Sequence, residues 1–206
     1  MQQAPPDFSV KAQQLIEVGR FFFERGWVPA TSGNFSARLD DDRLAITVSG
    51  RHKGRLGEAD IMLVDGQGQS LSAGRKPSAE TLLHTLLYRR DPDIRAVLHT
   101  HSVNATVLSK TGRTELRLRD YEVQKAFPGI DSHDCEITVP IIPNDQDMER
   151  LADRVVELLD RQPIPGYLIA GHGLYTWGNS VDDACRHIEA FEFLFECEVL
   201  TRRLGQ

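Results

Sequence analysis

Cysteine is scarce in this sequence, and the arrangement of the few cysteines excludes a disulfide framework. The 206 residues include only Cys135, Cys185 and Cys197. They are odd in number, widely spaced and form no CxxC pair, so neither a disulfide scaffold nor a cysteine zinc site is indicated. This pattern is typical of a reducing compartment, and we expect a cytoplasmic protein.

Long hydrophobic runs and an excess of basic residues are also missing. No window approaches the roughly 18 uninterrupted apolar residues of a membrane span. The start, MQQAPPDFSVKAQ, lacks the basic flank and apolar stretch of a signal peptide. Lys and Arg number 24 against 30 Asp and Glu, a net charge of −6, whereas nucleic-acid binding needs a concentrated basic face. We therefore expect neither a membrane nor a nucleic acid as partner.

Internal repeats, low-complexity tracts and evident linkers are absent, so we predict one domain over residues 1–206, with residues 1–8 as a flexible arm. Apolar residues at helical spacing predict helices after Ser9, Ser78, Asn144 or Asp145, and Ser180. Strands are predicted at 43–49, 61–65, 95–101, 137–142, 167–170 and 174–177, and a polar loop at 30–36. Because the strands cluster in hairpin-like pairs, we predict an α/β fold with a central, largely antiparallel sheet between helices.

Two histidines stand out at the end of the strand predicted at 95–101. Side chains alternate across a strand, so His99 and His101 point to the same face and make half of a metal site. The alternative is a buried hydrogen-bond network. A third histidine, His172, lies between two glycines that permit a tight turn. Three imidazole ligands that leave the fourth position of a zinc ion open form a catalytic geometry. The alternative for His172 is an ordinary hairpin turn with an exposed histidine.

The other histidines are weaker ligand candidates: His52, His84, His133 and His187. His84 follows Glu80 by one helical turn, and we expect it to pair with Glu80 or to face solvent. We place Glu80 in the first turn of a helix, where the helix dipole favours a carboxylate. Glu80 is then either a residue that stabilises the helix start or a functional group, namely a metal ligand or a proton-transfer group. Glu122, in the segment RDYEVQK, reads by itself as a surface carboxylate.

Several loops of small polar residues could bind phosphate through hydroxyls and backbone N–H groups. The segments are SGNFS at 32–36, the pair Ser49-Gly50, and Ser78 at a helix start. Ordinary turns are the alternative for each, and no GxxxxGKS or GxGxxG nucleotide motif is present. The basic turn at 50–57 could reach a phosphate or be solvated, and Arg51 and Arg55 are expected to be solvated.

Taken together, SGNFS, SG after a strand, KPSAE, HTH and GHGLYTWG occur in the order typical of the class II aldolase/adducin superfamily, which the sequence resembles over nearly its whole length. The resemblance implies an α/β/α fold, a sugar-phosphate substrate and a homo-oligomer, commonly a tetramer with active sites at subunit interfaces. It also implies one zinc ion per subunit, held by His99, His101 and His172. Phosphate contacts would come from Asn34, Ser49, Gly50 and Ser78.

Within the superfamily, the stretches GNFSAR, VPIIPN and GLYTWG are most similar to the branch that removes water from a methylthio-substituted pentulose phosphate in methionine salvage. In that branch a glutamate in the segment reading RDYEVQK here is the acid/base, which corresponds to Glu122. Sugar-phosphate aldolases use the glutamate of the KPSAE-type motif, Glu80. Because both are present, an aldolase or 4-epimerase remains the alternative, and a non-catalytic adducin-like binding domain the remote one.

Overall fold

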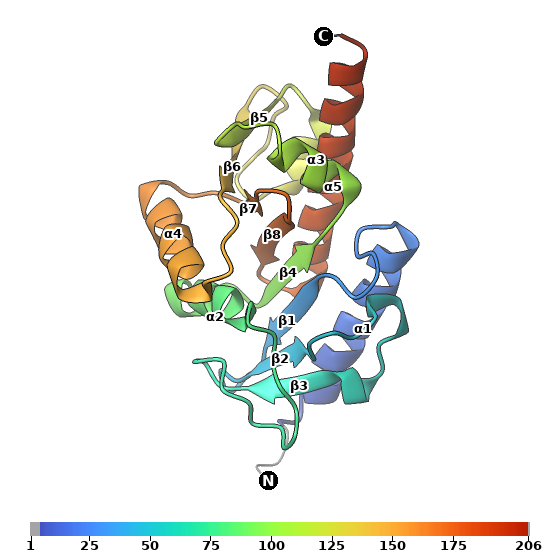
Figure 1. Ribbon diagram of the computed structural model, residues 1–206, viewed down its shortest axis with the longest axis vertical. Coiled ribbons are helices and arrows are strands. Elements are labelled where there is room, and N and C mark those ends of the chain that lie inside the picture. The colour runs from blue at the N-terminus through green and yellow to red at the C-terminus, as the bar shows by residue number, and fades with distance from the viewer. Residues whose placement is uncertain (1–4, 206) are drawn as a thin grey trace.

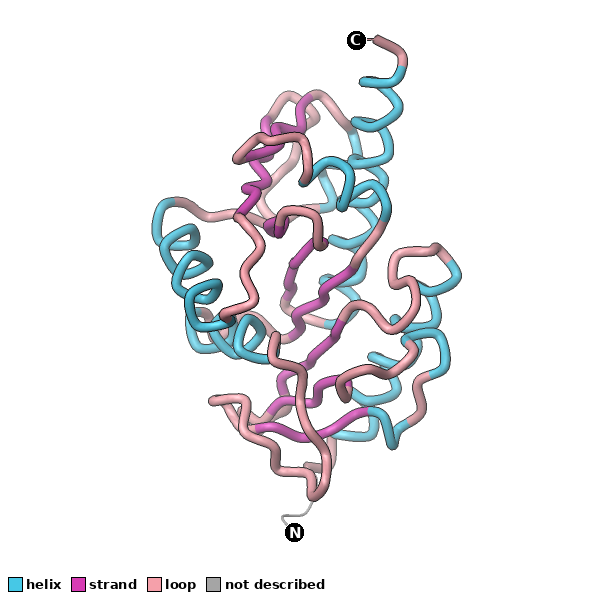
Figure 2. Tube along the Cα trace, in the orientation of Figure 1, coloured by secondary structure: helices cyan, strands magenta, loops and turns pink. Residues whose placement is uncertain are grey.

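An eight-stranded sheet forms the centre of the computed structural model, which describes residues 5–205 (Figures 1 and 2). The strand order is β3-β2-β1-β4-β8-β7-β6-β5. Every neighbouring pair is antiparallel except β6 and β7, which confirms the largely antiparallel sheet. The strands are β1 (Asn34–Arg38), β2 (Leu44–Thr47), β3 (Ile61–Val64), β4 (Ala96–Thr100), β5 (Glu115–Arg119), β6 (Glu136–Ile142), β7 (Gly166–Ile169) and β8 (Gly173–Gly178).

Helices cover both faces of the sheet, giving the three-layer α/β/α arrangement. One core contains residues of α1, α3 and α5, and the other contains residues of α2 and α4. Strand alternation separates the two cores: in β4, Leu98 joins the first and Val97 the second. The helices are α1 (Phe8–Glu24), α2 (Thr81–Arg90), α3 (Val103–Ser109), α4 (Met148–Arg161) and α5 (Val181–Arg203), with short 3₁₀ turns η1 (Lys53–Arg55), η2 (Glu58–Asp60) and η3 (Glu122–Ala126).

The loop predicted at 30–36 is wrong in its second half, because β1 begins at Asn34 and lies between β2 and β4. Its polar residues suggested a loop, but all five residues of the strand are buried. Ser36 bonds to a histidine and a tyrosine of α2, and the Arg38 guanidinium donates to the Asp91 carbonyl. Tertiary hydrogen bonds thus allow a polar sequence to form an interior strand. Strand β5 and helix α3 were not predicted.

Most helix starts differ from the predictions by a few residues. The cap at Ser180 is confirmed, since its hydroxyl accepts a hydrogen bond from the Asp183 amide at 2.9 Å. Helices α1 and α4 start after Asp7 and Asp147. Helix α2 starts after Glu80, which is therefore the N-cap residue and does not lie in the first turn.

The described part of the predicted N-terminal arm contacts the domain. Pro5 is buried, and the Asp7 carboxylate accepts a hydrogen bond from the Asp40 amide at 3.0 Å. Residues 1–4 of the arm lie outside the described residues. Within residues 5–205, no helix combines the length and apolar character required to cross a membrane.

Candidate metal centre

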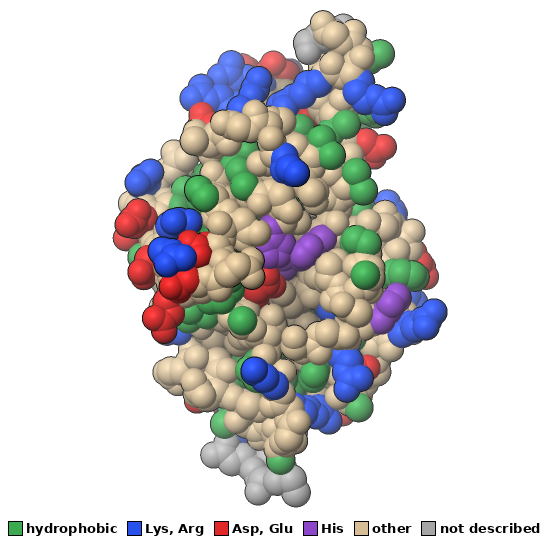
Figure 3. Space-filling view, viewed as in Figure 1, with side chains coloured by type: hydrophobic (Ala, Val, Ile, Leu, Met, Phe, Trp, Pro, Cys, Tyr) green, Lys and Arg blue, Asp and Glu red, His purple; other side chains and the backbone are tan. Residues whose placement is uncertain are grey.

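Three histidines from two parts of the sheet converge at one end of β4. His99 is in β4, His101 follows the strand, and His172 lies in the turn between β7 and β8. The Nε2 atoms of His101 and His99 are 2.8 Å apart, and those of His99 and His172 are 3.3 Å apart. One nitrogen from each ring lies within 4.8 Å of the others. Histidine side chains lie near the centre of the face shown in Figure 3.

The turn that carries His172 depends on its glycines. Gly171 has a φ of 65°, in the left-handed region that favours glycine. A Cβ atom at Gly173 would overlap the carbonyl group of Thr100. Both glycines therefore allow this turn to pack directly against the end of β4, where His172 meets His99.

The three imidazoles fit a divalent metal ion. The His99 Nδ1–H group donates to the Leu174 carbonyl at 2.8 Å, which leaves the His99 Nε2 lone pair facing the other rings. Burial drives the pKa of His99 well below its usual value, and burial together with the nearby His172 lowers the pKa of His101 to about 4. Neutral imidazole is the ligand form, and tetrahedral zinc with bonds of about 2.0–2.1 Å holds its ligands about 3.3 Å apart.

Glu80 completes the cluster. Its Oε1 atom lies 3.1 Å from His172 Nε2, its Oε2 atom lies 3.8 Å from His99 Nε2, and the Asn34 amide donates to Oε2. Burial opposes ionisation, but hydrogen bonds from His172 and Asn34 and the nearby His99 outweigh it, so the pKa of Glu80 is lowered. An ionised carboxylate thus adjoins the three imidazoles.

A pocket of about 460 Å³ opens beside this cluster. Its lining includes the four residues predicted to contact phosphate, together with Glu80, His101 and His172. The four are Asn34, Ser49, Gly50 and Ser78. Residues from three separate segments are therefore brought to one cavity, although each segment by itself reads as an ordinary turn.

The sequence analysis missed Lys53, which is the only Lys or Arg among the described residues that line this pocket. It is almost fully buried, and its Nζ donates to the carbonyls of Thr31 at 3.0 Å and Arg51 at 2.7 Å. Burial lowers the pKa of Lys53 to about 8 against the opposing charge of Glu80. The basic turn at 50–57 was the sequence feature from which Lys53 could have been identified as a candidate phosphate-binding residue. Arg51 itself is 57% exposed and pairs with Asp60, as expected for a solvated residue.

Glu122 lies away from the histidines of its own chain. It begins η3, its side chain is 68% exposed, and it does not line the pocket beside the histidines. Its carboxylate pairs with Lys125 Nζ at 2.5 Å and with His133 Nδ1 at 3.3 Å. The Lys125 ammonium group lowers the pKa of Glu122. Within one chain, the structure brings Glu80 to the histidines and leaves Glu122 on the surface.

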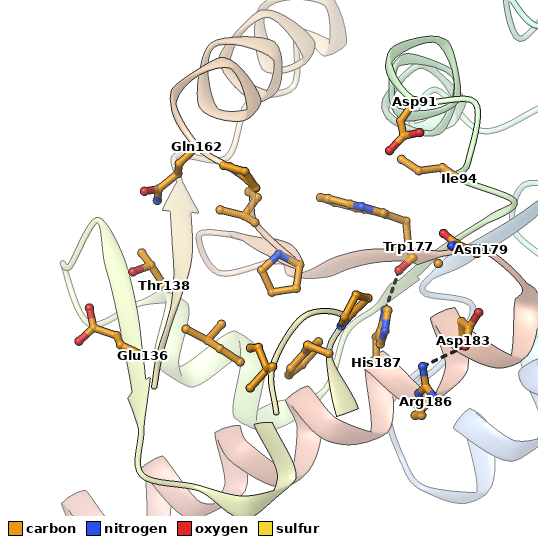
Figure 4. Close-up of a pocket in the computed structure, with 18 residues that line it drawn as sticks. Asp91, Ile94, Glu136, Thr138, Gln162, Trp177, Asn179, Asp183, Arg186 and His187 are labelled. Atoms are coloured by element: carbon orange, nitrogen blue, oxygen red, sulfur yellow. Dashed lines mark hydrogen bonds and ion pairs between the residues drawn. The ribbon is translucent and has the colours of Figure 1, made fainter. Parts of the chain in front are cut away.

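Two of the weaker ligand candidates are buried elsewhere. The expectation that His84 pairs with Glu80 or faces solvent is wrong: it is fully buried and bonds to Asn34 and Ser36. His187 donates from Nδ1 to the Trp177 carbonyl at 2.7 Å, a structural contact. It borders a second cavity of about 670 Å³ at the end of β8 away from His172 (Figure 4).

Comparison with known proteins shows which family and which solved structures this chain resembles. Residues 13–199 match the family model described as Class II Aldolase and Adducin N-terminal domain. Methylthioribulose-1-phosphate dehydratase of Pseudomonas aeruginosa strain UCBPP-PA14 is 61% identical over 94% of this chain and 96% of its own. The enzyme of the same name from Methylococcus capsulatus is 61% identical over 93% and 94%.

Solved structures share the fold at lower identity. L-fuculose-1-phosphate aldolase from Thermus thermophilus superposes with a TM-score of 0.78 and 26% identity, over 96% of this chain and 98% of its own. A putative aldolase/epimerase/decarboxylase from Escherichia coli superposes with a TM-score of 0.81 and 27% identity, over 95% and 91%.

Proposed function

The chain belongs to the class II aldolase and adducin family, and we propose that it is a methylthioribulose-1-phosphate dehydratase. The observation that carries the proposal is 61% identity, over nearly the full length of both chains, to relatives of that name. The reaction is the loss of one water from 5-methylthioribulose 1-phosphate to give 2,3-diketo-5-methylthiopentyl 1-phosphate, a step of methionine salvage. The enzyme is then a hydro-lyase, and we place it in the cytoplasm.

We propose one zinc ion per subunit, held by His99, His101 and His172. The supporting observation is a cluster of three nitrogen donors with an ionised carboxylate beside it. When bound, zinc would act as a Lewis acid on the substrate carbonyl. The sequence of steps consists of proton transfers and one elimination, so no redox cofactor is needed.

Removal of the C3 proton is assigned to Glu122. The C3–H electron pair forms the C3=C4 bond, the C4–O bond breaks, and the hydroxyl leaves with a proton as water; the enol then ketonises. A positioned acid/base of this kind contributes about 10²–10⁴-fold. Glu122 is exposed and does not line the pocket beside the histidines of its own chain. We therefore propose that it enters the corresponding pocket of a neighbouring subunit in a homotetramer. Glu80 then orients the site or serves as a second acid.

The phosphate group would be bound by the small polar loops that line the pocket. Asn34, Ser49, Gly50 and Ser78 offer an amide, hydroxyls and backbone N–H groups. Lys53 supplies the balancing positive charge, since it is the only Lys or Arg among the described lining residues. Its two bonds to loop carbonyls leave a third N–H donor for the ligand.

Replacement of Lys53 by methionine is expected to raise KM for the phosphorylated substrate about 10- to 100-fold with a smaller effect on kcat, since a hydrogen bond to a charged group is lost. Steady-state kinetics would measure both constants. Arg51→Met, which changes an exposed residue two positions away, is the matched control and should keep KM. An unchanged KM in Lys53→Met would contradict the assignment.

The proposed function is tested by the mass of the product formed from 5-methylthioribulose 1-phosphate by zinc-loaded protein, with a chelated sample beside it. A product lighter by one water, absent after chelation, is expected. The position of Glu80 favours aldol cleavage as the second candidate, because that glutamate corresponds to the aldolase motif. Dihydroxyacetone phosphate and methylthioacetaldehyde would identify that reaction, and unchanged substrate would refute both.

A further inference from the structure

A buried chain of hydrogen bonds runs behind Glu80. The Tyr88 hydroxyl lies 2.8 Å from the Ser36 hydroxyl, which lies 2.7 Å from His84 Nδ1. His84 Nε2 bonds to the Asn34 side-chain oxygen, and the Asn34 amide nitrogen bonds to Glu80. The four residues behind Glu80 are all at most 6% exposed. The four residues behind Glu80 are therefore buried, and the chain reaches the pocket at Asn34 and Glu80.

The spacing of these residues explains why they meet. Glu80 is the N-cap residue of α2, and His84 and Tyr88 follow it at intervals of four residues. The three side chains therefore share one face of the helix. Asn34 and Ser36 are two positions apart in β1 and share one face of the strand. Helix α2 packs on this side of the sheet, so the two series of side chains interdigitate.

Only one arrangement of hydrogens satisfies every bond. The Asn34 amide nitrogen donates to Glu80 Oε2, so the Asn34 oxygen faces His84. That oxygen only accepts, so His84 Nε2 must carry the hydrogen. In a neutral imidazole Nδ1 then accepts from Ser36, which in turn accepts from Tyr88.

The electrostatics agree with this arrangement. Burial lowers the pKa of His84 to about 4 against the opposing charge of Glu80, so the ring is neutral at neutral pH. Burial raises the pKa of Tyr88, which keeps its hydroxyl as a donor. Each group is in the protonation state that the directions of the bonds require.

We infer that His84 is a positioning residue, which fixes the Asn34 side chain so that its N–H group, and not its oxygen, faces Glu80. Without the His84 donor, the Asn34 oxygen loses its hydrogen-bond partner, and the Asn34 side chain is no longer held in the position from which its N–H group donates to Glu80. Glu80 would then lose the donor that holds it beside His99 and His172. The consequence for turnover rests on the proposed function, whereas the hydrogen-bond arrangement does not.

The kinetic test compares His84→Phe with His84→Gln. His84→Phe keeps a planar ring without a donor, and kcat is expected to fall about 10- to 100-fold, as for other outer partners of a metal site, with KM changed less than threefold. His84→Gln retains an N–H donor near the Nε2 position and should restore most of kcat. His187→Phe removes another buried histidine, outside the site, and should keep kcat. Equal loss in both His84 variants, or none, would overturn the inference.

A second measurement needs neither a variant nor turnover. In the metal-free wild-type protein, ¹⁵N NMR of the histidine side chains reports which nitrogen of His84 carries the hydrogen. The Nε2–H form is expected. The Nδ1–H form would overturn the inference even if dehydration is confirmed, and failure to dehydrate with the Nε2–H form present would refute only the proposed function.

Discussion

Replacement of His101 by alanine is expected to abolish metal binding and to lower turnover by at least about 10³-fold. His101 is one of three imidazoles whose nitrogens lie within 4.8 Å of one another. Loss of the metal removes several kcal/mol of transition-state stabilisation, and each 1.4 kcal/mol corresponds to tenfold in rate. Metal analysis of dialysed protein and initial rates of dehydration measure the two effects.

The matched control for this experiment is His52→Gln. His52 makes an edge-to-face contact with Phe23 of α1 and lies outside the cluster, so metal content and rate should both remain. A His101→Ala protein that keeps stoichiometric metal and full turnover would refute the assignment of the metal centre.

Replacement of Glu122 by glutamine is expected to lower kcat about 10²–10⁴-fold while metal content is unchanged, because the acid/base is lost and the histidines are not. If Glu122 serves the neighbouring subunit, mixed oligomers of Glu122→Gln and His101→Ala chains should regain activity. A site with histidines from the first chain and Glu122 from the second is intact, and random mixing in a symmetric ring gives about one such site in four. Rates of co-expressed, co-purified chains measure this recovery.

Glu80 provides the control for the mixing experiment. It lies 3.1 Å from His172 in the same chain, so Glu80→Gln and His101→Ala damage the same pocket, and their mixture should stay inactive. Recovery with Glu80→Gln, or none with Glu122→Gln, would show that the site is not divided between chains in this way. Full turnover of Glu122→Gln alone would exclude it as the acid/base.

The sequence predicted those features that depend on neighbours along the chain. Strand alternation placed His99 and His101 on one face, and their nitrogens are indeed adjacent. Clustering of the strands predicted the largely antiparallel sheet, and the cap at Ser180 was found from its own segment. The motifs also indicated the family over nearly the whole chain. Each of these signals is local, so no knowledge of the folded chain was required.

Local signals failed where a polar side chain finds its partner across the fold. Asn34 and Ser36 suggested a loop, yet β1 is interior because α2 supplies hydrogen bonds to these two side chains through His84. Lys53 was noted only as a member of a basic turn, but its ammonium group is buried and donates to the carbonyls of Thr31 and Arg51. A buried polar group is stable only when paired, and the sequence does not show the pair.

By itself, then, the sequence determined the α/β class, the antiparallel sheet, the family and the three histidines, because periodicity and motif order are properties of consecutive residues. Only the tertiary structure decided that Glu80 lies beside the histidines while Glu122 of the same chain is exposed. It also decided that His84 reaches Glu80 through Asn34. The physical reason is that hydrogen bonds between residues 46 and 50 positions apart form only when β1 and α2 pack against each other.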